Sequence, residues 1–168
     1  MRFDIITLFP EMFESFMASG VTRRAFDSGQ VQVHLWNPRD HATGNYRRVD
    51  DRPFGGGPGM VMMAEPLWLC LQAIRADRQQ DRTQAPLLFF APHGQVLNHA
   101  LVSSWAASEA GAVLLCGRYE GVDQRFVDAH VDGHISLGDF VLSGGEIPAM
   151  AFLDALASFW DGAAGGTA

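Results

Sequence analysis

Apolar segments of strand length alternate with helix-type patterns along this chain, and this alternation constrains the fold more than any other feature. Residues 3–9, 87–91 and 112–116 are apolar almost throughout, which is typical of strands buried on both faces of a sheet. Further extended segments are expected at 31–36 and 131–137. The expected helices cover residues 10–19, 65–76, 99–108 and 148–160. The sequence therefore predicts an α/β fold with a mainly parallel sheet and flanking helices.

Length and composition suit one domain with a substantial core. Of the 168 residues, 48% are apolar and 18% are charged, which excludes wholesale disorder. No apolar run is long enough to span a membrane, and the N-terminus does not resemble a signal peptide. Cys70 and Cys116 lie in apolar segments and are interpreted as buried thiols in a reducing compartment. We expect a cytoplasmic protein with one domain over residues 1–161 and a frayed tail over 162–168.

The charge distribution permits only a local nucleic-acid contact. The net charge of −7 argues against a generic nucleic-acid coat. All 12 basic residues are arginines, however, and most lie in the first half of the chain. One interpretation is a phosphate-binding patch, since arginine binds phosphate through two parallel hydrogen bonds. The alternative is that an arginine-only composition reflects the base composition of the genome. The patch would comprise Arg23, Arg24, Arg39, Arg47, Arg48 and Arg52.

Three loops that contain glycine are each predicted to follow a strand, at 92–94, 117–121 and 137–146. In a parallel sheet such loops gather at the carboxyl ends of the strands, where ligands bind. Glycine lets the backbone approach a ligand closely. Each loop alone could be a simple turn, but the three together predict a pocket.

Several common chemistries are excluded. The glycine run at 55–59 is not a phosphate-binding P-loop, because the chain contains no lysine. It also fails the dinucleotide-binding fingerprint, because Met60 and Met62 stand where the last glycine is needed. No GxSxG motif supports a serine hydrolase. The six histidines lack the spacing of metal ligands, so no metal site is predicted.

Four motifs carry a resemblance to a known family. They are FPEMF at 9–13, VDDRPFGGGPGM at 49–60, CGRYEGVD at 116–123 and LGDFVLSGGEIPAM at 137–150. In this order they resemble the bacterial tRNA (guanine-N1)-methyltransferases, and the similarity extends to about residue 160. These enzymes use S-adenosyl-L-methionine to methylate the guanosine on the 3′ side of the anticodon.

The resemblance implies a SPOUT-type domain with a deep trefoil knot in its C-terminal part. The knot loops would bind the methyl donor, with the adenine held by backbone groups of residues 137–142. The residues that the resemblance assigns to the methyl donor are Phe89, Phe90, Ala91, Pro92, Gly117, Tyr119, Glu120, Leu137, Gly138, Asp139, Phe140, Val141, Leu142, Gly144, Gly145 and Pro148.

The resemblance also implies two macromolecular partners, the anticodon arm of tRNA and a second copy of the chain in a homodimer. Glu120 suits guanine because a carboxylate can accept hydrogen bonds from N1–H and N2–H. The alternatives are a local ion pair for Asp50 and Arg52, and a solvated loop acid for Glu120. The residues assigned to the target guanosine are Asp50, Arg52, Gly57, Pro58, Gly59 and Glu120.

The sequence departs from the family's catalytic pattern. The aspartate that would accept the guanine N1 proton is expected beyond residue 168, as is the helical C-terminal domain that would hold the anticodon arm. Ser158 stands at the position of a catalytic arginine. Asp161 lies in another part of the motif and is not expected to replace the base. The catalytic set is therefore incomplete. The alternative function is a non-catalytic, dimeric module or pseudo-enzyme that binds S-adenosylmethionine.

Overall fold

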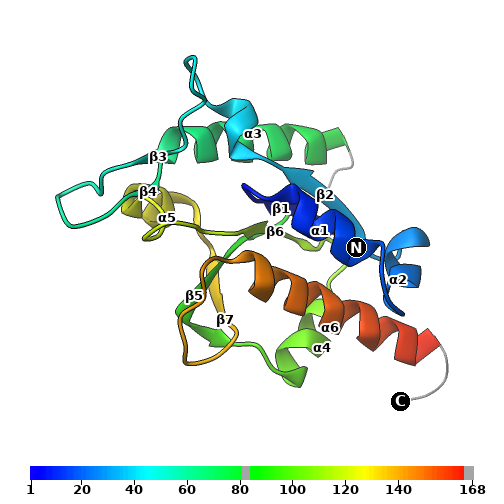
Figure 1. Cartoon of the computed structure of the whole chain (residues 1–168). Helices are drawn as coiled ribbons and strands as arrows, with labels where there is room; N and C mark the ends of the chain where they lie inside the picture. Colours follow the sequence, from blue (N-terminus) through cyan, green and yellow to red (C-terminus); the bar gives the residue numbers. More distant parts are fainter. Residues whose placement is uncertain (81–83, 165–168) are drawn as a thin grey trace.

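A five-stranded parallel sheet with helices on both faces forms the framework of the protein (Figure 1). The computed structural model describes residues 1–80 and 84–164. The strand order is β2-β1-β6-β5-β7, and the pairings within this sheet are parallel, as the sequence predicts. A separate antiparallel pair, β3 and β4, projects beside it. The strands are β1 (Arg2–Ile6), β2 (Gln32–Trp36), β3 (Asp50–Asp51), β4 (Val61–Met62), β5 (Leu87–Val96), β6 (Ala112–Leu115) and β7 (Gly133–Ser136).

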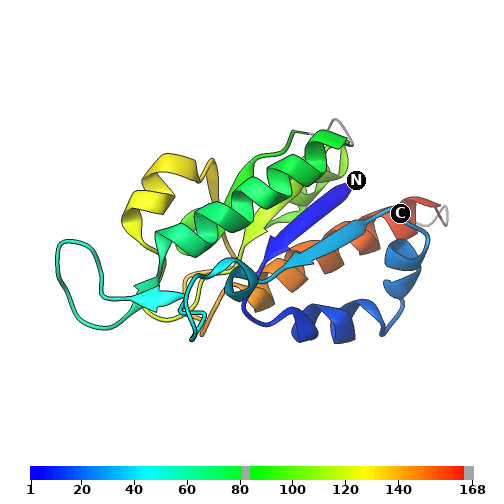
Figure 2. The same ribbon diagram turned by 90° about the horizontal axis from the view of Figure 1, so that it is seen from above.

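The helices cover the two faces of the sheet unequally (Figures 1 and 2). Helices α3 and α5 lie on one face, and α1, α2, α4 and α6 lie on the other. The helices are α1 (Pro10–Met17), α2 (Arg23–Asp27), α3 (Ala64–Gln80), α4 (His99–Ala106), α5 (Gln124–His130) and α6 (Glu146–Ala164), with a short 3-10 helix, η1 (Pro38–His41).

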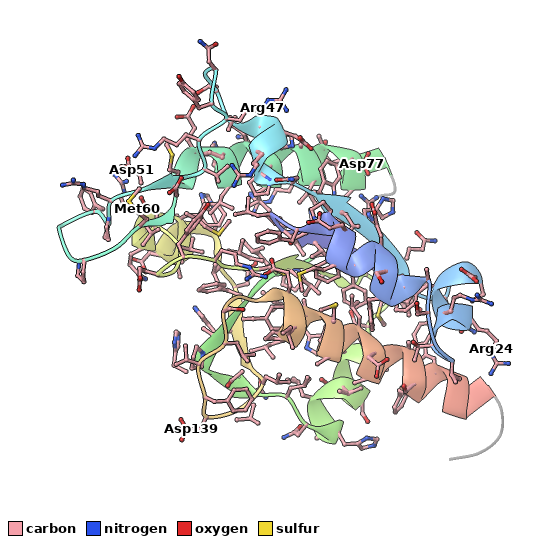
Figure 3. All side chains as sticks on the ribbon, viewed as in Figure 1. Arg24, Arg47, Asp51, Met60, Asp77 and Asp139 are labelled. Carbon is pink, nitrogen blue, oxygen red and sulfur yellow. The ribbon has the colours of Figure 1, made fainter. Side chains whose placement is uncertain are left out.

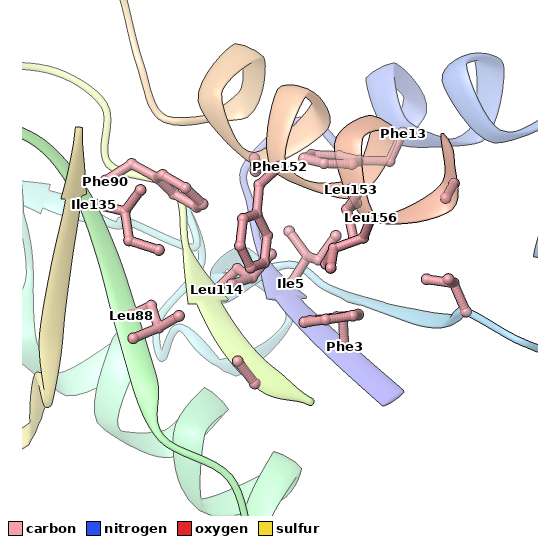
Figure 4. Packing of buried hydrophobic residues seen from close by; sticks show 14 of the residues in the cluster. Phe3, Ile5, Phe13, Leu88, Phe90, Leu114, Ile135, Phe152, Leu153 and Leu156 are labelled. Carbon is pink, nitrogen blue, oxygen red and sulfur yellow. The ribbon is translucent and has the colours of Figure 1, made fainter. Parts of the chain in front are cut away.

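Two hydrophobic clusters, one on each face, explain why the central strands are apolar on both sides. Successive residues of a strand point to opposite faces. Phe3 and Ile5 of β1 accordingly pack against α6, where the ring of Phe152 meets Phe3 edge-on at 5.8 Å between centroids (Figure 4). Ile6 joins the opposite cluster with Leu71 of α3. Both clusters contain side chains from the central strands, so both stabilise the same strand order.

The segment Pro92-His93-Gly94 was expected to be a turn, and this expectation is wrong. Strand β5 runs through it to Val96, and its register against β7 shifts between Phe90 and Gln95. Gly94 permits this path, because a Cβ at that position would lie 2.6 Å from the backbone of His134. The irregularity in β5 accommodates Pro92, which has no backbone N–H and so cannot donate a hydrogen bond to the neighbouring strand.

Two short helices, α2 and α5, do not appear among the expected elements. Helix α5 is capped by Asp123, whose side chain accepts a hydrogen bond from the backbone N–H of Arg125 at 2.9 Å. Helix α6 begins at Glu146 rather than Pro148, because proline is tolerated in the first turn of a helix. It continues to Ala164, into the segment expected as a frayed tail, and residues 165–168 lie outside the described part.

Both cysteines are buried free thiols, which confirms that expectation. Burial, and to a smaller degree the nearby carboxylates Asp40 and Asp4, raise the pKa of Cys70 to about 12. Burial likewise raises the pKa of Cys116 well above its ordinary value. Neither thiol is therefore suited to act as a nucleophile.

Within the described part of the chain, no helix combines the length and the apolar character that crossing a membrane requires.

A buried ion cluster fixes the N-terminal half of the sheet to α3. The carboxylate of Asp4 is fully buried and accepts hydrogen bonds from Arg2 at 2.9 and 3.1 Å and from Arg78 at 2.6 Å. It also accepts one from the indole of Trp36 at 2.9 Å. Arg78 additionally donates to the backbone carbonyl of Arg2 at 2.8 Å. The cluster thus joins β1, β2 and α3.

Replacing Asp4 with alanine removes the carboxylate from between two buried guanidinium groups. We expect the free energy of unfolding to fall by about 3–5 kcal/mol, the usual effect of breaking a buried ion pair from one side. Urea denaturation monitored by circular dichroism measures it. The matched control is Asp27→Ala, which breaks the exposed Arg23–Asp27 pair and should cost at most about 1 kcal/mol. Equal losses in the two variants would contradict the assigned role of Asp4.

Candidate active site

A cavity of about 490 Å³ lies at the carboxyl ends of β5, β6 and β7. Its walls are the irregular part of β5, the loop after β6 and the loop between β7 and α6. The three glycine-containing segments singled out in the sequence therefore meet at one site. All residues that the resemblance assigns to the methyl donor line the cavity, with the exception of Asp139.

Asp139 is exposed and lies on the outer side of its loop (Figure 3). Its neighbours Gly138 and Phe140 both line the cavity. Its side chain is therefore not part of the cavity wall, and a role for Asp139 in binding the methyl donor would fall to its backbone groups.

Glycine is required where the loops approach one another. The backbone N–H of Gly145 donates to the carbonyl of Gly117 at 3.0 Å. A Cβ at Gly145 would lie only 2.8 Å from the Cα of Cys116, so no side chain fits there. Tyr119, in the same loop, has a positive φ of 60°, which is uncommon for a residue other than glycine. The backbone of the loop after β6 is therefore restricted to one conformation beside the cavity.

Glu146 ties the walls of the cavity to the sheet. Its carboxylate is fully buried and accepts hydrogen bonds from the Thr7 hydroxyl at 2.8 Å and from Nε of Arg118 at 2.6 Å. The guanidinium of Arg118 also lies over the ring of Phe9, 4.5 Å from its centroid. Arg118 lines the cavity, but its charge is largely neutralised by Glu146.

Gly144 has a further role beside this ion pair. A Cβ at Gly144 would collide with the side chain of Arg118. The absence of a side chain therefore leaves room for the guanidinium as well as for a ligand in the cavity. This contact could not be predicted from the sequence, because Gly144 and Arg118 are far apart in the chain.

Of the residues assigned to the target guanosine, only Glu120 lines the cavity. Gly59 lies beside it, since a Cβ there would collide with the Glu120 side chain. The backbone N–H of Glu120 donates to the carbonyl of Met60 at 2.9 Å, which fixes the end of the glycine-rich loop at the cavity. Gly57 and Pro58 are exposed parts of the same loop.

Asp50 and Arg52 lie at the base of this loop, away from the cavity wall. The local ion pair in this segment forms between Arg48 and Asp51, at 3.1 Å, and not between Asp50 and Arg52. Asp51 also accepts a hydrogen bond from the backbone N–H of Arg52 at 2.7 Å. Phe54 anchors the loop to α5, with the guanidinium of Arg125 lying 4.3 Å from its ring centroid.

The six arginines considered as a phosphate-binding patch do not form one surface. Arg24 on α2 and Arg47 on the loop after η1 lie far apart (Figure 3). Arg23 pairs with Asp27, Arg47 with Asp40 and Arg48 with Asp51. A single patch is therefore wrong, and Arg47, Arg48 and Arg52 are the members that share the region of the glycine-rich loop.

Several residues of the cavity wall do not follow from the sequence motifs. They include His93 on β5, His134 on β7 and Gln124 and Val127 on α5. The two histidines meet because β5 and β7 are neighbours, and α5 contributes because the loop after β6 is short. In the described residues, no three His, Cys, Asp or Glu side chains gather as a possible metal-binding group.

A second hollow lies between α1, α2 and β2 and is lined by Glu14, Met17, Phe26, Val33 and neighbouring residues. It contains neither the glycine-bearing loops nor the ion pair described above, so the cavity at the strand ends is the better candidate for the site.

A parallel α/β domain with a glycine-lined cavity at its strand ends is typical of ligand-binding proteins. Comparison with known proteins identifies the family. The family profile described as tRNA (Guanine-1)-methyltransferase TrmD matches residues 1–168. This chain belongs to that family.

Individual relatives carry the same family name. The tRNA (guanine-N(1)-)-methyltransferase of Paracidovorax citrulli is 71% identical over 163 residues, which are 96% of this chain and 64% of the relative. That of Polaromonas sp. is 66% identical over 163 residues, 96% of this chain and 62% of the relative. The chain therefore spans less than two thirds of the length of these relatives.

A solved structure supports the fold. The crystal structure of tRNA (m1G37) methyltransferase from Aquifex aeolicus matches with a TM-score of 0.79 and 36% sequence identity. The match covers 94% of this chain and 69% of that one.

Replacing Glu146 with glutamine removes the charge that holds Arg118. We expect a loss of about 2 kcal/mol in the free energy of unfolding, below the usual range for a buried pair because Arg118 keeps some contact with water. Chemical denaturation measures it, with Glu11→Gln on the exposed side of α1 as the control. If both variants unfold at the same denaturant concentration, the ion pair does not hold the cavity wall.

Proposed function

We propose that this chain is the methyl-donor-binding part of an enzyme that transfers a methyl group from S-adenosylmethionine to N1 of the guanosine 3′ of the anticodon in tRNA. The observation that carries the proposal is the convergence of the three glycine-bearing segments on one cavity. Membership of the family gives the reaction class. A cytoplasmic location follows from the tRNA substrate.

The residues present fit the methyl donor. The cavity volume of about 490 Å³ lies in the range usual for small-molecule sites. The loop 137–145 offers backbone N–H and C=O groups, which match the donor and acceptor edge of adenine. Phe89, Phe90 and Phe140 provide apolar surface for the flat ring. When bound, S-adenosylmethionine supplies an electrophilic methyl group attached to a sulfonium.

Glu120 is the residue best placed to orient a guanine toward the cavity. Its carboxylate is an acceptor at the rim, and Gly59 keeps the adjacent surface free of side chains. Asp50 and Arg52 would act from the base of the same loop, on nucleotides outside the cavity. We also propose the homodimer and the trefoil knot that the resemblance implies.

The apolar face of α1 is not available to that dimer. Phe13 is buried in the intrachain core, and Phe16 and Met17 pack against the same cluster. Three exposed apolar side chains instead line the cavity, Tyr119, Phe140 and Val141, and Ile147 is exposed in the first turn of α6. A second copy would bury these side chains and enclose the cavity.

The alternative is a non-catalytic module that binds the methyl donor. Ser158 favours it, because this exposed serine of α6 cannot supply the positive charge that an arginine would place near the reacting guanine. Asp161 also lies in α6, and its side chain is outside what the structure describes.

Binding of the donor tests the cavity assignment. We expect calorimetric titration to detect S-adenosylmethionine and S-adenosylhomocysteine but neither ATP nor NAD. Gly144→Leu should abolish binding, because the new side chain displaces Arg118 and fills the cavity. The control is Ala107→Leu, at an exposed alanine outside the cavity. Full affinity in the Gly144 variant, or comparable binding of ATP, would contradict the assignment.

Methyl transfer separates the two candidate functions. With labelled S-adenosylmethionine, any methyl transfer by the chain should be confined to tRNA that bears guanosine after the anticodon and be absent from the same tRNA with adenosine there. Because Ser158 carries no charge, we expect turnover to be about a hundredfold below that of the Paracidovorax citrulli relative. Equal rates in the two proteins would show that Ser158 is not at a catalytic position, whereas no transfer to either tRNA would favour the non-catalytic module.

A further inference from the structure

Three aromatic side chains form a continuous part of the cavity wall, and the resemblance assigns no role to the two that are histidines. His93 on β5 and His134 on β7 have ring centroids 4.8 Å apart, with a tilt of 45°. The ring of Phe89 meets His134 edge-on, with centroids 5.8 Å apart. All three residues line the cavity. Phe89, His93 and His134 are called the aromatic wall below.

The aromatic wall is built by the sheet. Phe89 and His134 are register partners on neighbouring strands, and His93 reaches the same place because β5 is irregular after Phe90. Gly94 allows the close approach, since its missing Cβ would otherwise meet the backbone of His134. The pairing of the two imidazoles is therefore fixed by backbone geometry.

Few charges face the aromatic wall from the rest of the cavity. On the loop after β6, Arg118 is paired with Glu146, Tyr119 is a neutral phenol and Glu120 carries the acidic group at the rim. The lining residues of the loop after β7 and of α5 carry no ionisable side chain. The state of the two histidines therefore sets much of the charge that a ligand meets.

His134 is expected to be uncharged near neutral pH. Burial lowers the pKa of His134, and the neighbouring His93 lowers it further. Two protonated imidazoles at this separation would also repel each other. The neutral imidazole of His134 presents an aromatic face and edges, with no net charge.

We infer that the aromatic wall makes the cavity favour a cationic ligand over a neutral ligand of the same shape, and that protonation of His134 removes this preference. Aromatic faces attract cations, whereas a protonated imidazole repels them. The inference rests on the proposed function. S-adenosylmethionine carries a sulfonium charge and S-adenosylhomocysteine does not, so the pair of ligands isolates that charge.

The experiment compares the dissociation constants of the two ligands by calorimetry between pH 7.5 and pH 5.5. A histidine gains its positive charge as the pH falls, so affinity for the sulfonium should fall relative to the neutral product. We expect the ratio Kd(S-adenosylmethionine)/Kd(S-adenosylhomocysteine) to rise about threefold over this range, a modest change because His134 is only half-buried and solvent partly screens its charge.

The double variant His93→Gln, His134→Gln should show a ratio that does not change with pH, because glutamine does not titrate. The matched control is His99→Gln on α4, where the histidine contacts Phe159 outside the cavity. In this control variant the Kd ratio should rise with falling pH as it does in the wild type. Thermal unfolding of each variant checks that it is folded.

The outcomes distinguish this inference from the proposed function. If both ligands bind at pH 7.5 but the wild-type ratio stays flat, the inference is overturned and the donor site stands. If the ratio rises equally in the double variant, another group carries the effect and the inference is again overturned. If neither ligand binds at pH 7.5, both the proposed function and this inference are overturned.

Discussion

The buried carboxylate of Glu146 is the interaction on which the geometry of the cavity depends. A desolvated carboxylate is stable only with hydrogen-bond partners, and it finds them in Thr7 just after β1 and in Arg118 after β6. Because Glu146 also begins α6, one group fixes three segments that are distant in the sequence. The backbone contact between Gly145 and Gly117 at 3.0 Å then closes the wall beside it. Loss of the carboxylate would free the arginine and the loop together.

This arrangement separates structural charges from the charges that a ligand meets. Arg118 and Glu146 neutralise each other in the wall, and the cluster around Asp4 lies with α3 at the other end of β1. The cavity is left with Glu120 at its rim and with the paired imidazoles. A site of this kind can bind a ligand through backbone groups and aromatic rings, and can respond to one charge on that ligand.

The sequence predicted the layered α/β fold because its strand-length apolar segments can be buried on both faces only in a parallel sheet. It also predicted where the cavity lies, because glycine-bearing loops after parallel strands must meet at one edge. It did not predict that β5 continues through Pro92, since that depends on the backbone of β7 beside Gly94. Nor could it place His93 against His134, direct Asp139 outward or separate Arg24 from Arg47, because each depends on contacts between distant segments.

Hydrogen–deuterium exchange with and without S-adenosylmethionine tests the central claim most directly, because it reports which backbone segments the ligand covers. The account predicts slower exchange in residues 117–122 and 137–145, most of which line the cavity, and unchanged exchange in α2 and β2 around the second hollow. Protection confined to α2 and β2, or no protection at saturating ligand, would contradict the assignment of the cavity as the methyl-donor site.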